Sequence, residues 1–240
     1  MSAVLPRGAD EAALTLDTLA GPAQAEFLPT RLLRDGQGIT AEILADREVD
    51  ALVPRLLSTA AGAGSLFGLA IGLPEGVAQA LISGIKLPII LLGSAGVALP
   101  VLLVCCSLAG KRLRSAQISA LLLQALSTAA VTMAALAPLA VVAWLTASTF
   151  SDNDWYVYRR AVAAFTVVAA LGGLVGASRL LRALPWLAVL PWSGLFGVAG
   201  MQLMWLLRPV VGRPDGLVLL RAVESNGLAQ VLVLISTVLR

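Results

Sequence analysis

The chain alternates between long apolar runs and short charged stretches, and five of the apolar runs are long enough to span a membrane. They cover residues 56–74, 87–110, 118–148, 161–181 and 184–207. An α-helix crosses the hydrocarbon core of a bilayer with about 20 residues, within a range of about 17–25. The pattern predicts an all-α fold, a polytopic membrane helix bundle of about five transmembrane helices with additional amphipathic interfacial helices.

The same pattern divides the chain into three parts. Residues 1–55 are predicted to form an acidic soluble N-terminal arm with short helices, residues 56–210 the transmembrane bundle, and residues 211–240 a C-terminal amphipathic helix. Apolar residues recur at helical spacing from Ile39 to Leu56, so one amphipathic stripe is expected there. Residues 21–38 are broken by Pro and Gly and are predicted to be a loop.

Two segments each leave two interpretations open. Residues 75–86, EGVAQALISGIK, are amphipathic and lie either in the membrane interface or as an extension of a neighbouring helix. The arm of residues 1–55 either lies on its own membrane domain or provides a docking helix for a partner protein.

Glycine recurs every fourth position in two of the predicted spans. Gly64, Gly68 and Gly72 do so in the first span, and Gly172 and Gly176 do so in the fourth. Glycine at this spacing makes one face of a helix flat, so a second helix can approach it closely. These five glycines are predicted to be helix-packing positions.

The third span carries a mildly polar face within an apolar sequence. Gln124, Thr128 and Thr132 recur every fourth residue, with Ser127 beside them, and we expect them to face into the bundle. They either join neighbouring helices through hydrogen bonds or line a pore. Hydrogen bonding within the bundle is the simpler of the two interpretations.

Charged and aromatic residues at the ends of the apolar runs are expected at the level of the lipid headgroups. Long basic side chains reach water there, and Trp is enriched at that level. The predicted interfacial anchors are Lys86, Lys111, Arg112, Arg114, Trp205 and Arg208.

Composition agrees with a protein that faces lipid. Hydrophobic residues make up 58% of the 240 residues and charged residues 13%, against about 25% charged residues in a soluble domain. Residues 1–55 hold nine acidic residues against five arginines, and residues 56–240 hold twelve basic against five acidic residues. Because the basic residues are spread over short loops, they indicate the lipid bilayer as a partner and no nucleic acid.

Charge decides the orientation only weakly. With five spans and the N-terminus inside, seven basic residues fall on each side. The densest cluster, KRLR at 111–114, favours a cytoplasmic position for that loop. We therefore predict an integral membrane protein whose loop at residues 111–114 lies in the cytoplasm.

The sequence contains no arrangement of residues with a recognised chemistry. It has no His, which removes the commonest general base and metal ligand. The two cysteines, Cys105 and Cys106, are adjacent within an apolar run, as small buried hydrophobic residues would be. We predict that the protein is not an enzyme and that it holds no cofactor and no metal.

Two stretches resemble a known family. They are IKLPIILLGSAGVALPVLLVCC, followed by a basic turn and a span ending MAALAPLAVV, and GMQLMWLLRPVVGRPDGLVLLRAVESN. Together, over roughly residues 80–228, they are similar to an uncharacterised family of bacterial multi-pass membrane proteins. Some members are labelled as actin-binding WH2 domain-containing proteins, and the arrangement loosely resembles five-span Yip1-type proteins. The resemblance implies a bacterial membrane protein, and hence that the membrane is the bacterial cytoplasmic membrane. It implies no activity.

These observations predict a non-enzymatic membrane protein that acts as an anchor, or as an assembly or accessory subunit of a larger complex. Protein partners are expected at residues 1–55 and at the transmembrane faces, where a homo-oligomer is also possible. The alternative is a channel or transport subunit, an oligomeric pore lined by residues 118–148.

Overall fold

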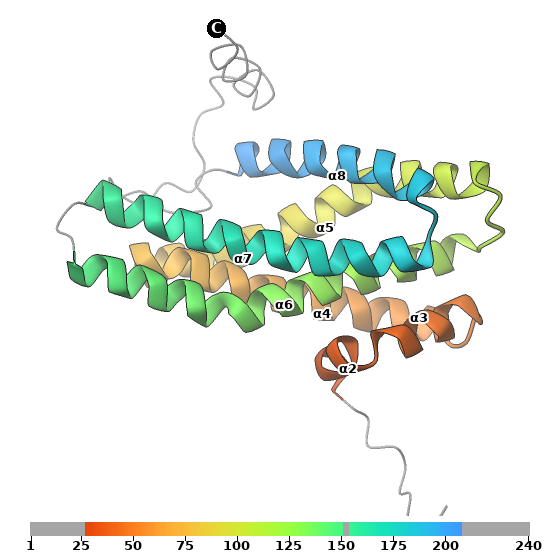
Figure 1. Ribbon diagram of the computed structural model, residues 1–240, viewed down its shortest axis with the longest axis horizontal. Coiled ribbons are helices and arrows are strands. Elements are labelled where there is room, and N and C mark those ends of the chain that lie inside the picture. The colour runs from red at the N-terminus through yellow and green to blue at the C-terminus, as the bar shows by residue number, and fades with distance from the viewer. Residues whose placement is uncertain (1–26, 151–153, 208–240) are drawn as a thin grey trace, which may run out of the picture.

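The computed structural model describes residues 27–150 and 154–207, and nearly all of these residues are helical (Figure 1). The elements are α2 (Leu28–Arg34), α3 (Gly36–Leu44), α4 (Val49–Gly72), the short 3₁₀ helix η1 (Leu73–Glu75), α5 (Val77–Leu108), α6 (Ser115–Phe150), α7 (Asp154–Ala183) and α8 (Trp186–Leu206). No strand occurs in this part of the chain, so the predicted all-α class is confirmed. The predicted C-terminal helix and Arg208 lie outside the described residues.

Five helices, α4 to α8, are long and apolar enough to cross a membrane. The protein is thus a multi-pass membrane protein, as its pattern of apolar runs predicts. The longest helix, α6, has 36 residues and is about 54 Å long at the rise of an α-helix. A hydrocarbon core is about 30 Å thick, so part of α6 extends beyond it.

The five long helices form a row in which each packs on the next. α7 packs on α6, α6 on α4, α4 on α5, and α5 on α8. Consecutive long helices run in opposite directions (Figure 1). Within the most apolar part of each helix, 56% of the residues of α6 are buried but only 17% of those of α8. Helix α6 is therefore central, and α8 is a peripheral helix that packs chiefly on α5.

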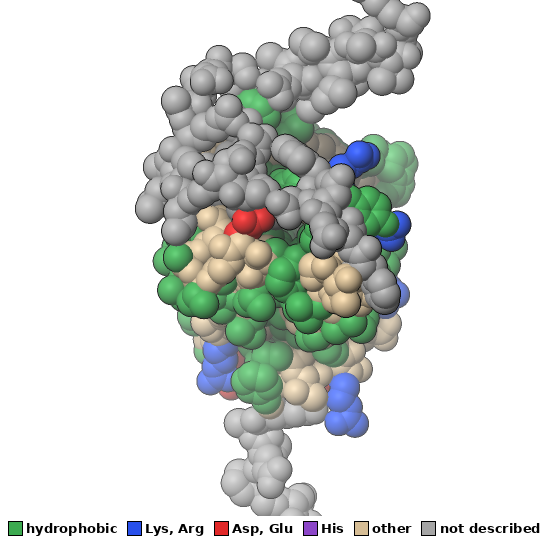
Figure 2. Space-filling model, turned by 90° about the vertical axis from the view of Figure 1, so that its left-hand side faces the viewer, with side chains coloured by type: hydrophobic (Ala, Val, Ile, Leu, Met, Phe, Trp, Pro, Cys, Tyr) green, Lys and Arg blue, Asp and Glu red, His purple; other side chains and the backbone are tan. Residues whose placement is uncertain are grey.

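Charged residues mark two levels along the bundle. Arg55 in α4 and Arg179 in α7 lie toward one end, while Glu75 and Arg160 lie toward the other. Arg55 and Glu75 are twenty positions apart, or about 30 Å at helical rise. We call the end with Arg55, Arg179 and the turn 111–114 the basic end. Figure 2 views the opposite, distal end, where uncharged side chains cover most of the visible described surface.

Two glycines predicted to pack helices lie where α4 crosses α5. A Cβ added to Gly72 would lie 2.5 Å from the Cα atom of Ala80, and one added to Gly68 would overlap the carbonyl oxygen of Ser83. Gly64 belongs to the same series but has more room, because its added Cβ would lie 3.7 Å from Pro88.

The other two glycines lie where α7 crosses α6. A Cβ added to Gly176 would lie 2.6 Å from the carbonyl oxygen of Ala125, and one added to Gly172 would overlap the side chain of Met133. At both crossings only a hydrogen atom fits between the backbones, so small residues set the distance between the helices.

The predicted loop at residues 21–38 is wrong for residues 28–38, which form α2 and the start of α3. Proline and glycine are helix breakers only in helix interiors. Pro29 lies in the first turn of α2, where a missing N–H costs nothing. Asp35 caps α3, because its Oδ1 accepts a 3.0 Å hydrogen bond from the backbone N–H of Gly38.

Helix boundaries elsewhere also differ from the expected ones. α4 begins at Val49, seven residues before the predicted span. The stripe from Ile39 onward is split between α3 and α4 by a turn in which Asp46 and Glu48 have positive φ angles of 56° and 49°. Residues 77–86 belong to α5, which is continuous from Val77 to Leu108. Of the two interpretations of this segment, extension of a neighbouring helix is therefore correct.

Candidate functional site

Helices α2 and α3 form an N-terminal hairpin, residues 28–44, that lies against α6 toward the basic end (Figure 1). Its apolar residues Leu32, Ile39 and Ile43 are fully buried and share one core with residues of α6 such as Leu121 and Leu122. The described part of the arm thus lies on its own membrane domain.

Two glutamines of α6 bind the two ends of α3. Gln124 donates from Nε2 to the carbonyl oxygen of Gly36 at 2.6 Å, and its Oε1 accepts from Thr40 Oγ1 at 3.1 Å. Two turns earlier, Gln117 donates from Nε2 to the carbonyl oxygen of Ile43 at 3.0 Å. The seven positions between the glutamines equal the seven positions from Gly36 to Ile43, about 10 Å on either helix. The spacing between the two contacts is therefore the same on both helices, and α3 runs antiparallel to this part of α6.

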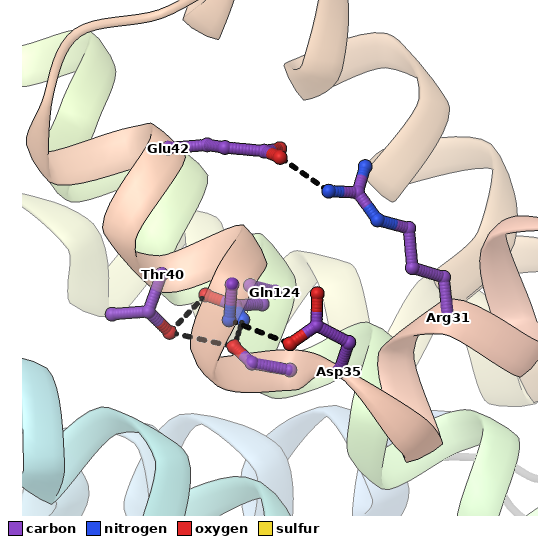
Figure 3. A network of polar contacts seen from close by, with 7 residues as sticks. Arg31, Asp35, Thr40, Glu42 and Gln124 are labelled. Carbon is purple, nitrogen blue, oxygen red and sulfur yellow. Dashed lines mark hydrogen bonds and ion pairs between the residues drawn. The ribbon is translucent and has the colours of Figure 1, made fainter. Parts of the chain in front are cut away.

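One ion pair joins the two helices of the hairpin, and another attaches the turn after α3 to the start of α6. Arg31 of α2 pairs with Glu42 of α3 on the side away from Gln124 (Figure 3). Arg114, at the start of α6, donates from Nη1 to Asp46 Oδ2 at 2.7 Å. This hydrogen bond, together with the charge of Asp46, raises the pKa of the Arg114 guanidinium above its ordinary value. Arg114 is thus an exposed residue of the basic end, as expected of an anchor, but it also holds the turn after α3.

The predicted polar face of α6 is bonded within the bundle. Ser127 Oγ donates to the carbonyl oxygen of Leu56 in α4 at 2.7 Å. Thr128 and Thr132 each donate to a carbonyl of α6 itself at 2.8 Å. Gln124, Ser127 and Thr128 are at most 2% exposed. Gln124 and Ser127 therefore join α6 to other helices of the same chain, in agreement with the simpler interpretation, whereas Thr128 and Thr132 bond to their own helix.

A second polar stripe, which sequence reasoning missed, lies on α5. Gln79, Ser83, Lys86 and Ser94 share one face and are at most 6% exposed. Gln79 Nε2 donates to Ser83 Oγ at 3.3 Å. The spacing of these residues is present in the sequence. The predicted boundary between residues 75–86 and the span from residue 87 divides the stripe between two segments, so neither segment shows it alone.

Lys86 lies on the buried face of α5, close to the contact between Gly64 and Pro88. Gly64 faces Pro88 across the α4–α5 contact, and it lies about midway between the charged levels at Arg55 and Glu75. Lys86 is within one turn of Pro88, so it shares this depth. It is predicted as an interfacial anchor, and its side chain is buried on α5, which begins nine residues before it. A buried ionisable group within a helix that can span a membrane is costly and marks a candidate functional position.

The other predicted anchors occupy different places. Lys111 and Arg112 are exposed in the turn between α5 and α6 at the basic end, and Trp205 is half-buried in the last turn of α8. The described residues contain no group of three or more acidic, Cys or His side chains that could hold a metal ion.

No family model, curated protein or solved structure matches this chain. The resemblance to bacterial multi-pass membrane proteins stays a prediction, and the function has to be argued from the geometry.

Proposed function

We propose that the protein is a non-enzymatic membrane anchor that assembles partner proteins at its basic end. The N-terminal hairpin carries this proposal, because α6 holds it in place through Gln117 and Gln124 while its outer side stays available. Leu33 and Leu44 are 44% and 43% exposed on these two helices, which also carry the ion pair of Arg31 and Glu42. Exposed apolar side chains rimmed by charges are typical of protein contact surfaces.

We also propose that the basic end faces the cytoplasm of a bacterial cell. Lys86 lies inside the bundle, so it no longer counts among the loop charges on the opposite side. Arg31 and Arg34 of the hairpin add to the basic end instead. With both changes, the basic end carries more basic residues than the opposite side, and the positive-inside rule favours the cytoplasm for the side with more of them.

Paired substitutions on the hairpin test the anchor proposal. The double variant Leu33→Ser with Leu44→Ser removes exposed apolar area without touching the buried face. We expect the chains that co-purify with the protein from its native membrane to fall several-fold, as measured by quantitative mass spectrometry. Leu57→Ser is the matched control, because Leu57 is 43% exposed but lies on α4. Unchanged recovery of every partner from the double variant would refute the proposal.

A second candidate function, a transport subunit, is favoured by one observation, the burial of Lys86 within a helix that can span a membrane. Transporters of protons and ions carry such groups within their spans. The stripe from Gln79 to Ser94 supplies further polar groups on the same face of α5. A transport path would then follow α5, and not the residues 118–148 first considered.

Proton flux into liposomes tests this second candidate. A potassium diffusion potential drives the flux, and a pH-sensitive dye inside the liposomes reports it. If the protein transports protons, Lys86→Met should reduce the rate at least about tenfold, since the charge is lost while the chain length is kept. Lys111→Met removes a charge from the exposed turn and should leave the rate unchanged. Absence of flux above empty liposomes for the unmodified protein would dismiss the candidate.

A further inference from the structure

A groove of about 900 Å³ runs along the outer side of α4 and α6, beside the start of the N-terminal hairpin. Phe27 and the first residues of α2 cover part of it, and Arg55 lies in its wall. Its floor is made of small residues, among them Gly62 and Ala134. A Cβ added to Gly62 would meet nothing within 4 Å, so the groove is open at this point and glycine is not needed there for helix packing.

The length of the groove matches the thickness of one leaflet of a bilayer. Along α4 it extends from Arg55 to Leu66, eleven positions, or about 16 Å at helical rise. Arg55 lies at the end of the groove nearer the basic end, and Leu66 lies at the other end. Half of a hydrocarbon core about 30 Å thick is about 15 Å. An acyl chain whose headgroup lies at Arg55 would therefore fill the groove from end to end.

The groove changes from charged to apolar along this direction. Arg55 is exposed at its outer end. Ser58 and Thr59 turn their hydroxyls toward the helix, where they donate to the carbonyl oxygen of Arg55 at 3.0 and 2.8 Å. Beyond them the walls are apolar, from Gly62 to Leu66. A cation at the headgroup level above an apolar channel is complementary to an anionic phospholipid.

We propose that this groove binds one anionic phospholipid from the leaflet at the basic end. Its phosphate pairs with Arg55, and one acyl chain lies over Gly62 between α4 and α6. Because Phe27 lines the same groove, the bound lipid also contacts the beginning of the hairpin.

Native mass spectrometry of the full chain in detergent tests the proposal, with dioleoyl-phosphatidylglycerol and dioleoyl-phosphatidylcholine as probes. The unmodified protein should bind one phosphatidylglycerol more tightly than phosphatidylcholine. Arg55→Gln should weaken phosphatidylglycerol binding about fivefold, the effect of one basic residue at a membrane surface, and leave phosphatidylcholine binding unchanged. Gly62→Leu should weaken both at least about tenfold, because the side chain fills the groove.

Gly173→Leu is the matched control, since a Cβ at this exposed position of α7 also meets nothing within 4 Å and the groove does not include it. It should bind both lipids as the unmodified protein does. Equal binding by Gly62→Leu and Gly173→Leu would overturn the proposal. If the protein bound lipid only after removal of residues 1–26, that segment would be the occupant of the groove. If the protein formed a lipid-free dimer that Gly62→Leu dissociates, a second copy of the chain would be the occupant. Either result would also overturn the proposal.

Discussion

Replacing Gly68 with Ala should destabilise the bundle, although the change adds only one methyl group. The new Cβ would overlap the carbonyl oxygen of Ser83 and lie 2.9 Å from the Cα atom of Gly84. Both are backbone atoms of α5, so α4 and α5 would have to separate along their contact. Overpacking costs about 1–3 kcal/mol, and contact with rigid backbone belongs at the upper end of this range. Ala gains about 1 kcal/mol over Gly in helix propensity, so the steric cost prevails.

Gly62→Ala on the same helix is the control, because it brings the same gain in propensity without the steric cost. A Cβ at this position meets nothing within 4 Å, so we expect a stabilisation of about 0.5–1 kcal/mol. Thermal unfolding in detergent, followed by circular dichroism, should therefore shift in opposite directions for the two variants. A shift of Gly68→Ala toward higher temperature would mean that the α4–α5 contact does not depend on this glycine.

The glycine spacing shows how far sequence alone can reach. Small residues at every fourth position indicate a close crossing, and Gly68, Gly72, Gly172 and Gly176 lie at such crossings. The distance between each glycine and the neighbouring helix depends on the crossing angle and on the partner helix. The spacing of the glycines predicts neither of these. Gly64 has the same spacing but only an ordinary contact.

The burial of Lys86 could not be predicted from the sequence. Its environment depends on where α5 begins, and residues 75–86 suit either an interfacial helix or the first turns of a span. Packing against α4 selects the second, because Gly68 and Gly72 accept the backbone of residues 79–84. The depth of Lys86 is therefore a tertiary property. The same holds for α2 and α3, whose Pro29 and Gly36 are typical of loops until the docked hairpin gives them helical neighbours.

The polar face of α6 was predicted from its spacing, but its partner was not. Gln124 and Gln117 bind carbonyl groups at the two ends of α3, more than seventy residues away in sequence. Nothing in the pattern of residues 118–148 identifies those carbonyls. Because the partner is α3, substitution of Gln117 or Gln124 is expected to release the hairpin.

Gln124→Leu should loosen the N-terminal hairpin while the long helices stay packed. The substitution removes the hydrogen bond from Gln124 Nε2 to the Gly36 carbonyl and one of the two acceptors of the Thr40 hydroxyl, which keeps the Gly36 carbonyl at 2.9 Å. Loss of a buried hydrogen-bond partner costs about 1–3 kcal/mol. Hydrogen exchange of the α3 amides should therefore accelerate at least about fivefold, with exchange in α7 unchanged. Adding Gln117→Leu should accelerate it further, because the second end of α3 is then released too.

Gln202→Leu is the matched control for this prediction. It makes the same chemical change in α8, where the buried Nε2 atom of Gln202 has no hydrogen-bond partner among the described residues. Its removal should leave the exchange of α3 unchanged and cost no stability. If Gln124→Leu behaved like Gln202→Leu, the buried side chains of Leu32, Ile39 and Ile43 would hold the hairpin without the glutamines. The anchor proposal requires a hairpin fixed in one position. The variant that combines Gln117→Leu with Gln124→Leu should therefore also reduce the recovery of partner proteins, in proportion to the increase in hydrogen exchange of α3.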